Sequence, residues 1–76
     1  MTERARQLLR NLVGKGRTRA EDLGMSQGDL AAAVADLGAI VDDDNRQVTV
    51  VKTYRADDRI TAIELTGPGR GLASHV

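Results

Sequence analysis

A single aromatic residue, Tyr54, stands among the 76 residues of this chain, and this scarcity limits the kind of core that the chain can build. Apolar residues make up 41% of the sequence, and almost all are small or aliphatic: ten Ala, eight Leu, seven Val and three Ile. Such a set can fill one modest hydrophobic core but not two. We therefore expect one small domain over residues 1–76, with a core of Leu, Ile and Val side chains.

The absence of cysteine excludes disulfides, thiolate chemistry and cysteine-based zinc sites, and it agrees with a reducing compartment. The longest apolar run, residues 30–35, is far shorter than the ~20 residues that a membrane-spanning helix needs. The first residues are charged and do not form the apolar block of a signal peptide. We expect a cytoplasmic protein that does not associate with a membrane.

Positive and negative charges are balanced in total, with 11 of each, but they are segregated along the chain. Residues 1–19 carry a net charge of +5, residues 20–44 a net charge of −7, and residues 45–76 a net charge of +2. Two basic regions could therefore approach a polyanion, whereas the acidic region between them could not. An ordinary mixed surface is the alternative interpretation of the same charges.

The N-terminal part predicts a leading helix over residues 3–13, because its apolar residues recur at the i, i+3, i+4, i+7 and i+8 spacing of one buried helix face. Gly14 and Gly16 end this leading segment, which spans residues 1–16. Thr18 and Glu21 then form a capping-box pattern, which predicts a short second helix over residues 18–23.

Ser26 and Asp29 repeat that capping pattern and predict a third helix over residues 26–38, completing a helix-turn-helix over residues 18–38. Two strands rich in β-branched residues follow near 47–55 and 60–66 and predict an antiparallel hairpin over 47–66. Residues 67–76, which begin Gly-Pro-Gly-Arg-Gly, predict a flexible tail. The expected core is Leu8, Leu9, Leu12, Leu23, Leu30, Val34, Leu37, Ile40, Ile63 and Leu65.

This order predicts an α+β fold: a small winged helix-turn-helix of three helices followed by a two-stranded antiparallel hairpin wing. The hairpin reads Asp57-x-Arg59, five residues, then Leu65-Thr66-x-x-Gly69-Arg70, and with this spacing it resembles the wing of the multiple-antibiotic-resistance regulator (MarR) family. The helix-turn-helix segment is also similar to that family, through Thr18-x-x-Glu21, Leu23-Gly24-Met25-Ser26 and the Leu30, Val34, Leu37 ladder. The resemblance covers residues 18–72, and the family's dimerisation helices have no counterpart in this sequence.

The resemblance implies a DNA-binding transcriptional regulator with Arg59 at the wing tip, near the DNA backbone or minor groove, and Asp57 orienting the basic groups around it. It also implies that Leu65 belongs to the core of the wing, and that Thr66 and Gly69 shape its exit.

Projected as a helical wheel, the third helix offers Gln27 as its only side chain able to make a bidentate contact with a base, which would be adenine. Affinity for double-stranded DNA would then depend on basic residues at the rims of the site. The residues expected to contact DNA are Arg17, Thr18, Arg19, Ser26, Gln27, Gly28, Ala31, Lys52, Arg55 and Arg59.

The small residues on the same helix, Gly28, Ala32 and Ala35, support an alternative function, because they would let a protein partner approach closely. A chain this small should need two copies for specific DNA binding, so a homodimer is expected if DNA is the target. Its surface would be the face of the leading helix or a half-apolar face of the strands.

Catalysis, metal binding and cofactor binding are not expected. His75 is the only histidine and lies next to the C-terminus, where no group would orient it as a general base. The acidic run at residues 42–45 lacks the spacing of a calcium loop, and the glycine-rich segment after the second strand lacks the features of a phosphate loop.

Overall fold

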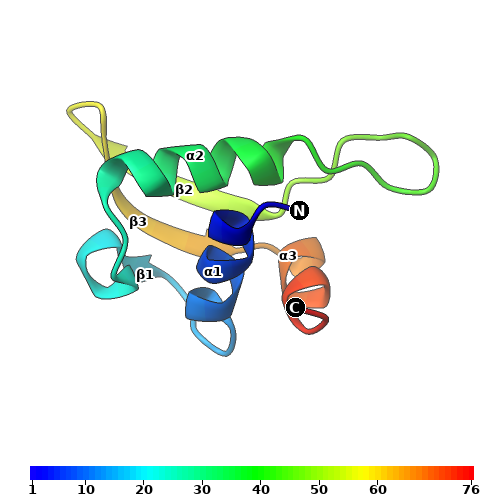
Figure 1. Cartoon of the computed structure of the whole chain (residues 1–76), viewed down its shortest axis with the longest axis horizontal. Coiled ribbons are helices and arrows are strands. Elements are labelled where there is room, and N and C mark those ends of the chain that lie inside the picture. The colour runs from blue at the N-terminus through cyan, green and yellow to red at the C-terminus, as the bar shows by residue number, and fades with distance from the viewer.

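The computed structural model describes residues 1–76 as three α-helices and a three-stranded antiparallel sheet (Figure 1). The elements in chain order are α1 (Glu3–Leu12), β1 (Thr18–Arg19), the 3₁₀ helix η1 (Ala20–Leu23), α2 (Gln27–Gly38), β2 (Val51–Ala56), β3 (Arg59–Leu65) and α3 (Gly67–Ala73). The expected architecture of three helices followed by a two-stranded wing is therefore wrong. One helix follows the strands, and the sheet contains a third strand.

Residues 18–23 do not form the predicted short α-helix. Thr18 pairs with Ile63 and Arg19 with Ala62, so these two residues are a strand at the edge of the sheet, followed by η1. The Thr18 hydroxyl donates to the Gly16 carbonyl at 3.0 Å and does not cap a helix. Pairing with β3 buries Thr18, and this long-range interaction overrides the local capping pattern.

Residues 67–73 form α3 instead of a flexible tail. The Thr66 hydroxyl accepts a hydrogen bond from the Gly69 amide at 3.1 Å, and Pro68 lies in the first turn, where its missing N–H is not needed. Gly69 is buried and lies directly against Val50, the residue before β2. A Cβ at this position would lie only 1.9 Å from the Val50 carbonyl oxygen, so no larger residue fits here. The glycine therefore permits a close approach between backbones.

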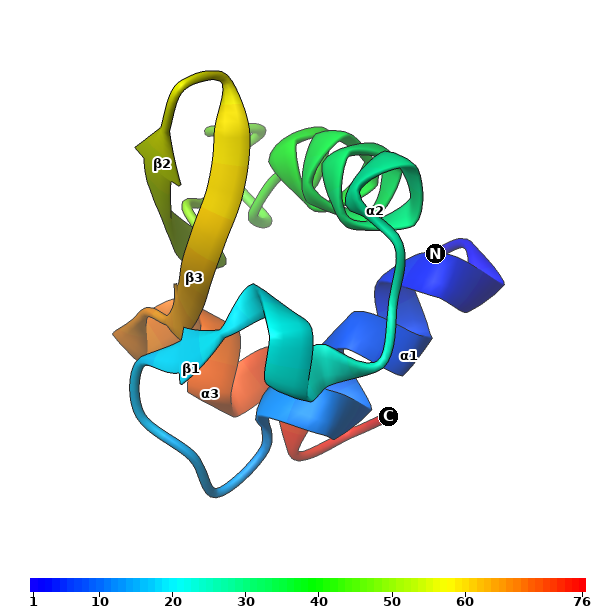
Figure 2. The same ribbon diagram turned by 90° about the vertical axis from the view of Figure 1, so that its left-hand side faces the viewer.

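The other two predicted helices are confirmed within a residue or two. Thr2 caps α1 by accepting from the Ala5 amide at 3.3 Å, and Ser26 caps α2 by accepting from the Asp29 amide at 3.1 Å. The apolar faces of both helices are buried in the core. Figure 2 shows the two helices beside the sheet.

The sheet has the order β1-β3-β2, and β2 and β3 form the expected antiparallel hairpin. β2 begins at Val51 and not at 47, since the Val48 amide donates to the Ile40 carbonyl at 3.0 Å in the preceding loop. The register places Tyr54 opposite Ala62 and Arg55 opposite Ile60, which leaves Thr61 as an extra residue in β3. This bulge reverses the alternation of side chains.

The core contains 14 residues, none of them aromatic. Eight of the ten predicted core residues are buried, while Val34 and Ile40 pack at its edge. The core predicted from the sequence does not include Ile60. Strict alternation starting from Ile63 would point residue 61 into the core and Ile60 away from it, but the bulge at Thr61 places Ile60 on the core side.

Candidate nucleic-acid interface

The three strands bring together basic residues that are far apart in the sequence. Strand alternation places Lys52 and Tyr54, with their partners Glu64 and Ala62, on the side of the sheet opposite the buried Ile63. Figure 2 shows α1 and α2 to one side of the hairpin, which leaves the other side without a covering helix. We call the following residues the outer sheet face: Arg17, Arg19, Lys52, Tyr54, Arg59, Ala62 and Glu64.

Tyr54 is the centre of two cation contacts on this face. The guanidinium carbon of Arg17 lies 4.0 Å from the centroid of the Tyr54 ring, and Nζ of Lys52 lies 5.2 Å from it. The Tyr54 hydroxyl donates to Oε1 of Glu64 at 3.0 Å. The Glu64 carboxylate thus fixes the hydroxyl end of the ring, and the face of the ring stabilises the positive charges of Arg17 and Lys52 next to it.

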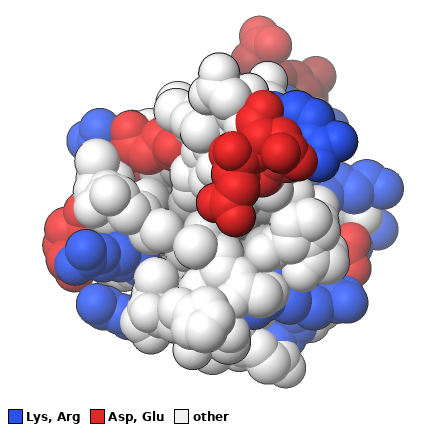
Figure 3. All heavy atoms as spheres, turned by 90° about the vertical axis from the view of Figure 1, so that its right-hand side faces the viewer, with Lys and Arg blue, Asp and Glu red and all other residues white.

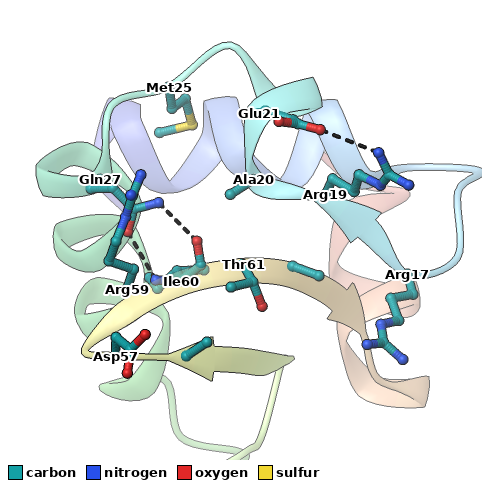
Figure 4. Close-up of a pocket in the computed structure, with 12 residues that line it drawn as sticks. Arg17, Arg19, Ala20, Glu21, Met25, Gln27, Asp57, Arg59, Ile60 and Thr61 are labelled. Carbon is teal, nitrogen blue, oxygen red and sulfur yellow. Dashed lines mark hydrogen bonds and ion pairs between the residues drawn. The ribbon is translucent and has the colours of Figure 1, made fainter.

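Next to this ring is an open hollow of about 1000 Å³ between the β1–η1 segment and the hairpin (Figure 4). Figure 4 places Arg17 near one end of the hollow and Arg59 beside Gln27 at the other. Arg19 lines the hollow as well, and its lining includes Ile60 and other apolar side chains. Three arginines from two chain segments therefore surround one concave surface.

The charges of this surface are only partly neutralised within the molecule. Arg19 pairs with Glu21 at 3.3 Å, and Asp57 also lines the hollow. Arg17, Lys52 and Arg59 have no carboxylate within ion-pair distance. These three cations are available to an anionic ligand.

Gln27, the residue expected to contact a base, is hydrogen-bonded within the molecule. Its Nε2 donates to the Ile60 carbonyl at 2.8 Å, and its Oε1 accepts from the Ile60 amide at 2.9 Å. Both ends of the side-chain amide are thus used to join the start of α2 to β3, which holds the side chain against the hairpin. The partner is 33 residues away, so no local sequence signal could have revealed it.

The exposed surface of α2 carries small residues and no cation. Gly28, Ala31 and Ala35 are exposed there together with Asp29. Asp36 turns towards α1, where it accepts hydrogen bonds from the Thr2 hydroxyl at 2.6 Å and from Nε of Arg4 at 2.9 Å. The Thr2 hydroxyl, followed by the Arg4 guanidinium, lowers the pKa of Asp36 below its ordinary value of 3.8.

The ten predicted contact residues therefore fall into four groups. The structure brings Arg17, Arg19, Lys52 and Arg59 together, and it places Gly28 and Ala31 on α2. Thr18, Ser26 and Gln27 have structural roles, and Arg55 is exposed in β2 without lining the hollow. Sequence reasoning missed Tyr54, although its being the only aromatic residue was a usable signal.

The apolar face of α1 cannot form a dimer surface, because Ala5, Leu8, Leu9 and Leu12 are all fully buried within the chain. β2 lies at an edge of the sheet, where a second copy could add a further strand. None of the helices has the length and apolar character needed to cross a lipid bilayer. No three acidic or histidine side chains are grouped so that they could hold a metal ion.

The opposite end of the molecule is formed by the loop between α2 and β2. Arg46 in this loop pairs with Asp42 at 3.2 Å and with Asp44 at 3.1 Å. Figure 3 looks onto this end and shows an acidic group at its centre, with basic side chains towards the margins. This end does not offer a surface for a polyanion.

No family model, curated protein or solved structure matches this chain. The resemblance to the MarR family therefore stays a prediction from the sequence, and the candidate interface is defined by its own geometry.

Proposed function

We propose that this chain is a small cytoplasmic, non-enzymatic protein that binds DNA through its outer sheet face. The observation that carries the proposal is the convergence of Arg17, Lys52 and Arg59, none of them paired with a carboxylate, on one side of the sheet. Lysine and arginine side chains that neutralise phosphates release counterions, which is the main source of sequence-independent affinity for DNA.

The proposed binding mode has little direct reading of bases. At the start of α2, the Ser26 side chain caps the helix and the Gln27 side chain is bonded to the hairpin, while the exposed face bears the negative charge of Asp29. Phosphate contacts fix the position of a protein on DNA without reporting the sequence. We therefore expect weak binding that differs little between DNA sequences. The sequence resemblance of the segment from Asp57 to Arg70 to the MarR family supports the same ligand class.

The test is a titration of fluorescently labelled duplex DNA at several salt concentrations. Three to four phosphate contacts predict a slope of about −3 to −4 in a plot of log affinity against log salt concentration, because each contact contributes about −0.9. The triple variant Arg17→Ala, Lys52→Ala, Arg59→Ala should bind at least about tenfold more weakly at low salt and should lose most of this slope.

The matched control is the triple variant Arg6→Ala, Arg10→Ala, Arg46→Ala, which makes the same change in net charge at exposed positions outside the outer sheet face. It should retain most of the affinity. Equal loss in both variants would mean that DNA responds only to net charge, and absence of binding by the native protein at low salt would reject DNA as the ligand.

The alternative function is a protein-interaction module that uses the exposed face of α2. The observation that favours it is the open surface at Gly28, where an added Cβ would meet only the Ser26 hydroxyl, at 3.9 Å. This function would be supported if the native chain does not bind DNA but binds a protein partner, and if Gly28→Ala prevents binding of that partner.

A further inference from the structure

Tyr54 is a large aromatic side chain that this fold does not use in its core. All 14 core residues are aliphatic or alanine, and Tyr54 lies half-buried on the outer sheet face. Its only side-chain hydrogen bond is to Glu64, itself on that face. The ring therefore belongs to the interface more than to the hydrophobic core.

The cation next to the ring is weakly held. Arg17 is exposed and forms neither an ion pair nor a side-chain hydrogen bond, so its contact with the Tyr54 ring at 4.0 Å is its main anchor. Lys52 likewise has no carboxylate partner within ion-pair distance. A flat ligand could displace Arg17 from the ring, and the released guanidinium would then be free to bind a phosphate.

From this arrangement we propose that an unpaired nucleobase stacks on Tyr54 while Arg17 and Lys52 hold the phosphates on either side of it. The inference rests on the proposed function and names the part of the DNA that is preferred. An aromatic platform beside basic side chains is the usual means of binding single strands, because every base has a π-face. Bases inside a duplex are stacked on each other, so DNA with a short single-stranded end should bind better than blunt duplex.

The experiment compares three DNA molecules: a blunt duplex, the same duplex with a three-nucleotide overhang, and that duplex with an abasic overhang. The last two carry the same phosphates and differ only in their bases. The natural overhang should bind about fivefold or more tightly than the abasic one, since one stacked base contributes a factor of that order. Fluorescence of Tyr54 should change with it, since the chain has no other tyrosine and no tryptophan.

Two variants separate stacking from folding. Tyr54→Phe keeps the ring and loses the bond to Glu64, and it should keep the preference for the natural overhang. Tyr54→Leu removes the ring and should bind the natural and the abasic overhang equally. Circular dichroism checks that both variants are folded.

The outcomes distinguish this inference from the function on which it rests. If the native protein binds natural and abasic overhangs equally, the stacking inference is overturned, and DNA binding through phosphates stands. If it binds none of the three molecules, blunt duplex included, the proposed function is rejected and this inference with it. Loss of the preference in Tyr54→Phe would also overturn stacking, because the ring is still present.

Discussion

The exposed face of α2 and the outer sheet face differ in almost every property that matters for binding DNA. The first consists of small side chains and an aspartate, whereas the second holds four cations and the only aromatic ring. The order of elements in the sequence predicted that α2 would contact DNA. Of these two surfaces, however, only the outer sheet face has cationic side chains that could bind a polyanion. We therefore base the proposed function on the chemistry of this surface and not on the position of an element in the fold.

The difference arises because the polar residues of α2 are used inside the molecule. Ser26 caps the helix, Gln27 is bonded to Ile60, and Asp36 is bonded to Thr2 and Arg4. No residue of the outer sheet face is used in this way except Arg19 and the Tyr54–Glu64 pair. Substitutions in the two regions should therefore have different effects.

Gln27→Ala should have the largest effect on stability. It leaves the amide and carbonyl of the buried Ile60 without their partners, which should lower the free energy of unfolding by about 1–3 kcal/mol. DNA affinity should fall equally for AT-rich and GC-rich duplexes, because the hairpin is loosened and no base contact is lost. Urea denaturation and competition binding measure the two effects, with the exposed Gln7→Ala as control. A change in sequence preference without loss of stability would return Gln27 to the role of a base-reading residue.

Glu21→Gln should strengthen DNA binding about twofold to threefold at low salt, since it removes a negative charge from the hollow and frees Arg19. Stability should hardly change, because both partners of this pair are largely exposed to solvent. Asp22→Asn makes the same charge change at a neighbouring exposed residue that does not line the hollow. If both variants bind equally tightly, the hollow has no special part in binding.

Asp36→Asn should alter how stability depends on pH. Because the pKa of Asp36 is lowered in the folded state, its ionised form stabilises the fold at pH values above 3.8, and this contribution is lost as pH falls through the lowered pKa. The native protein should therefore lose stability below about pH 4 more steeply than the variant. Thermal unfolding from pH 2 to pH 7 measures this. DNA affinity at neutral pH should be unchanged, and a decrease would mean that α2 contributes to the interface.

Gly28→Ala should have the smallest effect. Space is available for the added methyl group, so the helix should be stabilised by at most about 1 kcal/mol. DNA affinity should stay within about twofold of the native value if the outer sheet face is the interface. A loss of more than that, with stability maintained, would place DNA against α2 and contradict the contrast between the two regions.

Local patterns in the sequence were sufficient for α1, α2 and the hairpin, because caps and apolar periodicity act between residues close in the chain. They failed at Thr18, where pairing with Ile63 determines the structure, and at Gly69, whose fit against Val50 depends on tertiary packing. The same distinction holds for the site. Basic residues were identified by their type, but the contact of Arg17 with Tyr54 and the internal use of Gln27 depend on contacts between distant segments.

Under the proposed function, the two-residue turn between β2 and β3 limits how this molecule can lie on DNA. Asp57 and Asp58 both adopt left-handed backbone conformations, with φ of 51° and 64°, and place two carboxylates at the tip of the hairpin. A tip with that charge is repelled by the phosphates that line a groove, so the hairpin has to approach with its broad side. The six residues of β2 extend about 20 Å, which corresponds to a footprint of about six base pairs at 3.4 Å each. The proposed function therefore implies that many copies bind side by side on a long DNA, each at any position along the duplex.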